Sequence, residues 1–265
     1  MRQGYAKKRY GQHFLHDPGT IERIVRAIDP RPGDRIVEIG PGRGAITAPV
    51  LTHSGAVDVI EIDREVVPTL QAHCAGRGEL HVHFADALEF DLRGLRGAGA
   101  KLRLIGNLPY NVSTPLLFRF IAQLDAIADM HFMLQKEVVR RMAAAPGTGD
   151  YGRLTVMLAP HVKVEPLFDI GAGAFQPPPQ VVSTFFALHP HEAPPFDTGP
   201  TATFARVVAA AFSKRRKTLR NALMGLLTAD QIKAVGVDPG ARAETLSPAQ
   251  FGALARQADA VAPLS

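Results

Sequence analysis

Apolar runs of strand length alternate with helix-like patterns through the first two thirds of the chain. This alternation predicts an α/β fold in which helices cover both faces of a parallel sheet, because parallel strands are joined by helical crossovers. The strands are expected over residues 35–39, 57–62, 80–85, 102–105, 130–134, 162–167 and 181–188. The helices are expected over residues 21–28, 45–51, 66–74, 115–121 and 153–161.

A proline-rich segment then interrupts the pattern. Residues 190–200 hold four prolines and one glycine, a composition typical of a linker. Helical patterns follow over 204–227 and 248–259, and no further strand is expected. The sequence therefore predicts a large α/β domain over 1–189, a linker over 190–200 and a small all-helical domain over 201–265.

Composition narrows the class of protein. Hydrophobic residues make up 46% and charged residues 21% of the 265 residues, which is typical of a folded globular chain. No apolar run approaches the roughly 18 residues that span a bilayer. The single cysteine, Cys74, cannot form an internal disulfide, and no basic-then-apolar leader opens the chain. We therefore expect a cytoplasmic protein without a membrane anchor.

The excess of positive charge lies at the two ends. Residues 1–10 contain four basic and no acidic side chains, and residues 200–265 contain nine basic and four acidic ones. The stretch between them carries 17 basic and 21 acidic side chains. Such segregation indicates a polyanionic partner. The candidate phosphate contacts are Lys7, Lys8, Arg9, Lys214, Arg215, Arg216, Lys217 and Arg220.

A glycine-rich motif joins the first main strand to the next helix. In Glu38-Ile39-Gly40-Pro41-Gly42-Arg43-Gly44-Ala45, the glycines allow a sharp turn and close backbone approach to a ligand. The motif is ambiguous, because Gly40, Gly42 and Ala45 also match the nucleotide fingerprint of NAD enzymes. A tight turn that binds nothing is a further interpretation.

Two acidic side chains follow at strand ends. Glu61 lies 21 positions after Gly40, close to the offset of about 20 at which a carboxylate accepts the ribose hydroxyls of a nucleoside. Asp63 is better explained as a solvated charge at the strand end. Asp86, after the third strand, could accept a hydrogen bond from an adenine amino group, or could simply cap a turn.

The turn after the fourth strand determines the class of reaction. An exocyclic amino group on an aromatic ring is a poor nucleophile, because its lone pair is delocalised. The side-chain carbonyl of Asn107 and the backbone carbonyl of Leu108 could accept its hydrogens, while Pro109 stiffens the turn. Tyr110 offers a face on which a flipped base can stack. This arrangement favours methylation of such an amine over hydride transfer.

Several motifs together resemble those of the ribosomal RNA adenine dimethyltransferases, in particular the type that modifies small-subunit (16S) RNA. The resemblance covers nearly the whole chain. It includes residues 11–15 (GQHFL), the glycine motif, Glu61, Asp86, 107–115 (NLPYNVSTP), 151–154 (YGRL), 175–183 (FQPPPQVVS) and 212–221 (FSKRRKTLRN).

This resemblance implies a Rossmann-like, class I methyltransferase fold that uses S-adenosylmethionine and no metal. It implies that Phe175 stacks on the target adenine opposite Tyr110, although the residues alone would equally allow a core aromatic side chain. The implied donor-binding residues are His13, Leu15, Gly40, Gly42, Glu61, Asp86, Ala87 and Asn107.

The expected activity is dimethylation of two adjacent adenosines near the 3′ end of 16S RNA in an immature small subunit, by a monomer. Three alternatives stay open. The chain could modify large-subunit (23S) RNA and give macrolide resistance, it could act mainly as a subunit-assembly factor through binding, or it could be an NAD-dependent oxidoreductase. The last of these rests on the glycine motif alone.

Overall fold

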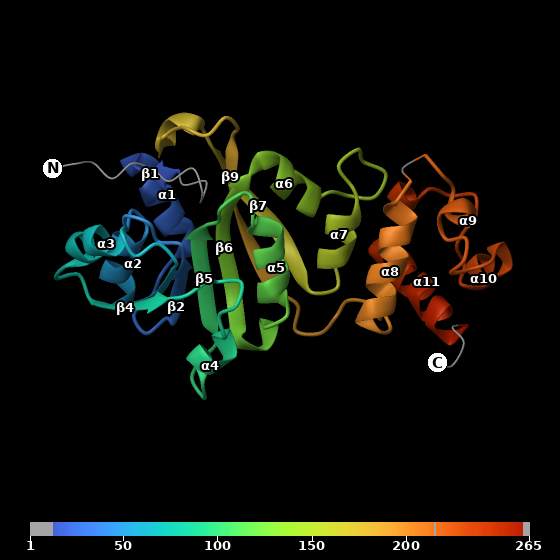
Figure 1. Ribbon diagram of the computed structural model, residues 1–265, viewed down its shortest axis with the longest axis horizontal. Helices are drawn as coiled ribbons and strands as arrows, with labels where there is room; N and C mark the ends of the chain where they lie inside the picture. The colour runs from blue at the N-terminus through green and yellow to red at the C-terminus, as the bar shows by residue number, and fades with distance from the viewer. Residues whose placement is uncertain (1–12, 215, 262–265) are drawn as a thin grey trace. The chain divides into compact units, whose positions relative to one another are not determined.

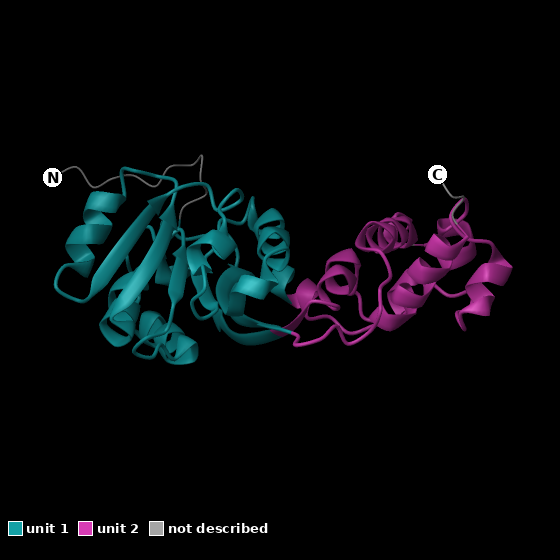
Figure 2. Ribbon diagram, turned by 90° about the horizontal axis from the view of Figure 1, so that it is seen from below, with its two compact units in different colours: residues 1–139, 165–190 teal, residues 140–164, 191–265 magenta. Residues whose placement is uncertain are grey.

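The computed structural model describes residues 13–214 and 216–261 (Figure 1). The chain forms two compact units, coloured separately in Figure 2. Unit 1 comprises residues 1–139 and 165–190, and unit 2 comprises residues 140–164 and 191–265.

The unit boundaries differ from the sequence-based division in one respect. Residues 140–164, expected in the first domain, group with the C-terminal residues. The reason is a long-range contact that no local pattern reveals: the hydroxyl of Tyr151 donates to the carbonyl of Leu246, 95 positions away, at 2.7 Å. Residues 191–200 contain neither helix nor strand, as the proline content predicts.

The core of unit 1 is a seven-stranded sheet in the order β4-β3-β2-β5-β6-β9-β7. All seven expected strands form, and the pairs from β4 to β6 are parallel. However, β9 pairs antiparallel with β6, so the sheet is mixed, because a buried apolar run does not encode strand direction. The strands are β2 (Ile36–Ile39), β3 (Ala56–Glu61), β4 (Glu79–Phe84), β5 (Leu102–Asn107), β6 (Ile127–Gln135), β7 (Val162–Ile170) and β9 (Ser183–Pro190).

Helices cover both faces of this sheet. Met133 of β6 and Phe185 of β9 belong to one buried cluster with apolar residues of the first three helices. Phe132, the neighbour of Met133, stacks on Phe120 of α5 at 5.5 Å between ring centroids. Since neighbouring strand residues point to opposite faces, α5 lies on the other side. The helices and 3-10 turns of this unit are α1 (Pro18–Ile28), α2 (Thr47–Ser54), α3 (Val67–Cys74), α4 (Leu92–Arg96), α5 (Ser113–Ile121), η2 (Leu124–Ala126) and η3 (Ala172–Ala174), and α6 (Lys136–Met142) begins in this unit and ends in unit 2.

A two-stranded sheet that the sequence did not predict adjoins the main one. β1 (Phe14–Leu15) pairs antiparallel with β8 (Phe175–Gln176), and Leu15 lies opposite Phe175. Two residues are too few to show a period of two. The pairing attaches the residues around His13 to the segment that precedes β9.

Unit 2 is helical, and within its described residues after 190 no strand forms, as expected. The long helix expected over 204–227 is interrupted, because the N–H of Leu219 bonds to the carbonyl of Ala241 at 2.8 Å instead of to the preceding turn. Phe212 and Phe251 stack at 5.5 Å in its core. The elements are α7 (Arg153–Leu158), α8 (Thr201–Phe212), α9 (Leu219–Ala222), α10 (Ala229–Ala234), η4 (Ala243–Thr245) and α11 (Pro248–Ala260).

Candidate active site

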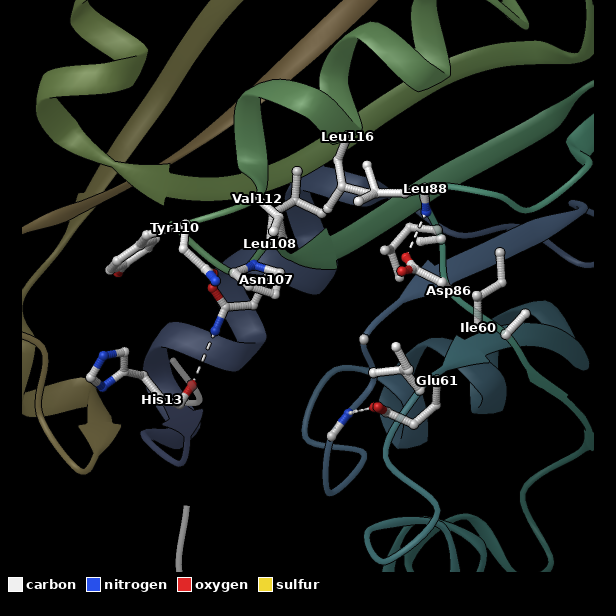
Figure 3. A pocket seen from close by; sticks show the side chains of 18 residues that line it. His13, Ile60, Glu61, Asp86, Leu88, Asn107, Leu108, Tyr110, Val112 and Leu116 are labelled. Atoms are coloured by element: carbon white, nitrogen blue, oxygen red, sulfur yellow. Dashed lines mark hydrogen bonds between the residues drawn. The ribbon is translucent and has the colours of Figure 1, made fainter. Parts of the chain in front are cut away.

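A cavity of about 270 Å³ lies at the carboxyl ends of β2, β3, β4 and β5, where open α/β sheets bind ligands (Figure 3). Parallel strands end at the same edge of a sheet, so residues far apart in the sequence meet there. The predicted site residues that line it are His13, Gly40, Gly42, Glu61, Asp86, Ala87, Asn107, Leu108, Pro109 and Tyr110.

The glycine motif forms the turn after β2. Gly40 has a positive φ of 64°, a conformation that other residues rarely adopt. A Cβ atom at this position would meet no atom within 4 Å, and the residue lines the cavity, so a side chain would occupy space open to a ligand. The backbone itself is therefore exposed to whatever binds in the cavity.

Glu61 ends β3 with a buried carboxylate, 5% exposed. Its Oε1 accepts from the N–H of Asp63 at 2.8 Å and its Oε2 accepts from the N–H of Gly42 at 3.4 Å. Burial raises the pKa of Glu61, and these backbone donors oppose that rise. The carboxylate is thus held in the cavity with its acceptor oxygens next to the glycine turn.

Asp63 is not the solvated charge expected from the sequence. It is 5% exposed, and its Oδ1 accepts from the N–H of Glu65 at 3.1 Å. The chain turns inward after Ile62, so the carboxylate caps the turn that leads to α3. Ile62 itself is 51% exposed and lines the cavity.

Glu38 lies deeper, in the middle of β2, and is 2% exposed. Burial raises its pKa to about 7, and the nearby charge of Glu61 adds to that rise. Within the described residues its Oε2 has no hydrogen-bond partner. The sequence-based site did not include Glu38, and its position in the glycine motif was the available indication.

Asp86 has the turn-capping role that the sequence allowed, and its contact with an adenine amino group stays a prediction. Its Oδ1 accepts from the N–H of Leu88 at 2.9 Å, which caps the turn after β4. The residue is exposed and also lines the cavity. Because an ionised carboxylate has about four acceptor positions, the turn bond leaves capacity for a ligand.

The orientation of the Asn107 side chain follows from one hydrogen bond. Its Nδ2 donates to the backbone carbonyl of His13 at 3.1 Å, as Figure 3 shows. A carbonyl can only accept, so the amino end of the amide must face His13 and the Oδ1 atom must face elsewhere. The same residue lines the cavity. Asn107 therefore offers an acceptor oxygen beside the ligand space.

Close packing beneath this turn depends on Gly106. A Cβ atom there would lie 2.5 Å from the carbonyl oxygen of Ile39 on the neighbouring strand, so no other residue fits without displacing β2. The turn is further fixed by the N–H of Leu108, which donates to the carbonyl of Met133 at 3.3 Å. The backbone at Leu108 is consequently anchored to β6.

Tyr110 and His13 stand side by side at the edge of the cavity. Their ring centroids lie 6.0 Å apart with 29° between the planes. The hydroxyl of Tyr110 is 2.7 Å from Oγ of Ser183, and burial raises the pKa of Tyr110. The tyrosine ring is half-buried, which leaves part of it available for stacking.

Two predicted site residues do not line this cavity. Leu15 and Phe175 are 7% and 2% exposed and belong to the hydrophobic core of unit 1. They pair across the β1/β8 sheet, and this pairing turns both side chains into the core. In this structure Phe175 is a core aromatic side chain, as the residues alone allowed, and its stacking on a target base stays a prediction.

The basic residues are only partly described. Lys214, Arg216, Lys217 and Arg220 are exposed in the segment that joins α8 to α9 and at the start of α9. Lys7, Lys8, Arg9 and Arg215 lie outside the described residues. Across residues 13–214 and 216–261, no cluster of three metal-binding side chains occurs, and no helix is both long and apolar enough to cross a bilayer.

The cavity fits S-adenosylmethionine. Most of its lining is apolar, and acceptor oxygens of Glu61, Asp86 and Asn107 are available to the hydroxyl and amino groups of the donor. The fold and this site define an S-adenosylmethionine-dependent methyltransferase of the Rossmann-like class I type. The ribosomal RNA adenine dimethylase family model matches residues 4–259. The chain belongs to this family.

Individual relatives agree with the family model. The chain is 52% identical over 251 residues to a ribosomal RNA small subunit methyltransferase A of Methylococcus capsulatus, covering 95% of this chain and 97% of that protein. The protein of the same name from Pseudomonas aeruginosa is 50% identical over 257 residues, covering 97% and 96%.

Solved structures show the same fold. A dimethyladenosine transferase from Plasmodium falciparum superposes with a TM-score of 0.78 at 25% identity, covering 91% of this chain and 96% of that chain. The 23S rRNA methyltransferase ErmE superposes with a TM-score of 0.71 at 25% identity, covering 93% and 99%. The resemblance to rRNA adenine dimethyltransferases is thereby confirmed, and the enzyme class excludes the oxidoreductase alternative.

Proposed function

We propose that this enzyme dimethylates N6 of two adjacent adenosines in the 3′-terminal hairpin loop of 16S rRNA, within immature small ribosomal subunits. The observation that carries the proposal is the oriented amide of Asn107, which presents an acceptor oxygen in the donor cavity. The relatives at about half identity are named as small-subunit enzymes, which favours 16S over 23S rRNA.

Different residues around the cavity bind different parts of the methyl donor, S-adenosylmethionine. Glu61 is suited to the ribose hydroxyls and Asp86 to the adenine amino group, while the glycine turn approaches the rest of the molecule with its backbone. His13 lines the cavity and is assigned to the same site, whereas the Leu15 side chain faces the core, so any contact of Leu15 with the donor would have to come from its backbone. S-adenosylmethionine supplies a methyl group that is already activated by its positive sulfur.

The protein has to activate the acceptor nitrogen. Oδ1 of Asn107 and the carbonyl of Leu108 accept the two hydrogens of the adenine amino group, which localises its lone pair toward the methyl carbon. Holding the two reacting atoms about 3–3.5 Å apart and in line can contribute about 7–11 kcal/mol. The proton leaves to water after transfer, so we assign no general base. The second transfer needs a slot wide enough for the monomethylated nitrogen to rotate.

The target base must leave its helix to reach this cavity. Tyr110 provides a face for stacking, and basic residues at both ends of the chain, including Lys214, Arg216, Lys217 and Arg220, provide phosphate contacts. We further propose that the enzyme acts as a monomer in the cytoplasm, where its ribosomal substrate is assembled.

The test is direct labelling. The enzyme is incubated with methyl-labelled donor and, in separate reactions, with small and large subunits from a strain whose rRNA lacks these methyl groups. Labelled dimethyladenosine is expected in the small-subunit RNA alone. Label confined to the large subunit would assign the activity to 23S rRNA instead.

The Asn107→Ala variant distinguishes the proposed enzymatic role from the alternative, in which the protein acts mainly as an assembly factor through binding. This variant is expected to lose methyl transfer and to keep its affinity for small subunits. If it restores subunit assembly in a strain without the enzyme as well as wild type does, binding is the main role.

A further inference from the structure

The segment between β8 and β9 touches the edge of the active site at both of its ends. At one end the carbonyl of Pro177 is 2.8 Å from Nδ1 of His13, so this ring nitrogen is the donor. At the other end Oγ of Ser183 is 2.7 Å from the hydroxyl of Tyr110. Because the rings of His13 and Tyr110 lie beside one another, the segment holds the pair from both sides.

We propose that Ser183 is a positioning residue for methyl transfer. It fixes the ring of Tyr110 in the orientation that receives the flipped adenine. The proposal rests on the proposed function, in which Tyr110 stacks on that base. Ser183 does not line the cavity and acts only through the tyrosine.

The hydrogen bond between Ser183 and Tyr110 is buried, which supports a specific structural role for it. Ser183 is fully buried at the start of β9, where water cannot replace a lost partner. Tyr110 is held at its other end too, since its backbone carbonyl accepts from Oγ of Ser113 at 3.1 Å. With the backbone and the hydroxyl both anchored, the ring has little freedom to turn before the base arrives.

The next residue offers a matched control. Thr184 is also buried, and its hydroxyl donates to Oδ1 of Asp169 at 2.6 Å. Neighbouring strand residues point to opposite faces, so this second hydroxyl lies away from Tyr110. Thr184→Val therefore removes one buried hydroxyl from the same strand without touching the tyrosine.

The experiment compares Ser183→Ala, Tyr110→Phe, the double variant and Thr184→Val. Each is assayed for kcat and KM with unmethylated small subunits, for the ratio of monomethyl- to dimethyladenosine produced, and for melting temperature. Affinity for S-adenosylhomocysteine is measured by calorimetry, since it reports the donor cavity independently of RNA. Tyr110→Phe removes the same hydrogen bond and leaves Ser183 in place. This variant therefore tests the proposal if Ser183→Ala fails to fold.

Loss of one buried hydrogen bond predicts a fall of about fivefold in kcat/KM for Ser183→Ala and for Tyr110→Phe. The double variant should fall no further, because both changes break one bond. Both single variants should release more monomethyladenosine, since a loosely held base escapes between transfers. Thr184→Val should stay within about twofold of wild type, and affinity for S-adenosylhomocysteine should be unchanged throughout.

Two results would overturn the proposal. One is wild-type kinetics and product ratio in Ser183→Ala or, where that variant does not fold, in Tyr110→Phe. The other is a fall in kcat/KM in the double variant that equals the product of the two single falls. That result would show that Ser183 and the Tyr110 hydroxyl act separately. Failure of the proposed function looks different, because the wild-type enzyme itself would then not label small subunits.

Discussion

The two units differ in their charge balance and in the burial of their charged side chains. Unit 1 contains 17 basic and 18 acidic side chains, and four of the basic ones lie in residues 1–10. Three of its acids, Glu38, Glu61 and Asp63, are almost completely buried. Unit 2 contains 13 basic and 7 acidic side chains, and Lys214, Arg216 and Lys217, between α8 and α9, are exposed.

This difference separates recognition of a small ligand from recognition of a polyanion. A few buried groups in fixed positions bind strongly and specifically, and the loss of one is costly. Exposed cations act additively through a screened field, so the loss of one is mild. Substitutions in the two units should therefore differ in both the size and the kind of their effects.

The largest effect is expected at Asn107. Asn107→Ala removes an acceptor that is set in place before the reaction, and the loss of one such group lowers kcat by about 10²–10³-fold. Asn107→Asp keeps the shape but places a carboxylate against the carbonyl of His13, so it should be similarly impaired. Single-turnover methylation of small subunits measures both. Near-normal turnover in Asn107→Ala would contradict the proposed activation of the amine.

Glu38→Gln should change how stability depends on pH. An acid whose pKa is higher in the folded than in the unfolded protein contributes stability that is complete below the unfolded pKa and is lost as pH rises through the folded pKa. For Glu38 these values are 4.5 and about 7. One unit of pKa corresponds to 1.36 kcal/mol, so the free energy of unfolding of the wild type should fall by up to about 3 kcal/mol across this pH window. The variant, which cannot ionise at this position, should not show this fall.

Urea unfolding followed by circular dichroism at several pH values between 5 and 8 measures this difference. Glu22→Gln is a suitable control, because Glu22 is exposed and forms a surface ion pair with Arg26. Parallel pH profiles for wild type and Glu38→Gln would show that ionisation of the buried Glu38 carboxyl does not lower the stability of the protein.

Glu61→Gln should weaken donor binding. A hydrogen bond to a charged group contributes about 1.5–3 kcal/mol, so affinity for S-adenosylhomocysteine should fall about tenfold or more. Because burial raises the pKa of Glu61, wild-type affinity should decrease with falling pH at values where an ordinary glutamate is still ionised. Calorimetry over a pH series tests both points. An identical pH dependence in the variant would assign the titration to another group.

The smallest effect is expected at Lys217 in unit 2. Lys217→Ala removes one exposed cation, so affinity for small subunits should fall about threefold at moderate salt, and the slope of log K against log salt should decrease by about 1. Donor affinity should not change. Lys101→Ala, an exposed lysine of unit 1, is the control in the same filter-binding assay. An equal effect of the two substitutions would remove the distinction between the units.

Much of the fold was predictable because it depends on local patterns. Strand positions followed from apolar runs, and the helices of unit 1 that cover the sheet around the site followed from periodicity. The helix expected over 204–227 is interrupted after α8, since the backbone donors of Leu219 and Arg220 bond to a segment about 20 residues away. Short elements such as α4, α6, α10 and the β1/β8 sheet lie below the length at which a period is visible.

The sequence by itself determined the chemical groups at the carboxyl ends of the strands: the glycine turn, Glu61, Asp86 and the Asn107–Tyr110 turn. These could be found because parallel strands bring consecutive strand ends to one edge, whatever the details of packing. Only the tertiary structure decided that Asp63 and Phe175 are buried, that the amide of Asn107 is turned by the carbonyl of His13, and that Ser183 holds Tyr110. Burial and side-chain orientation depend on contacts between distant segments, and such contacts leave no periodic trace along the chain.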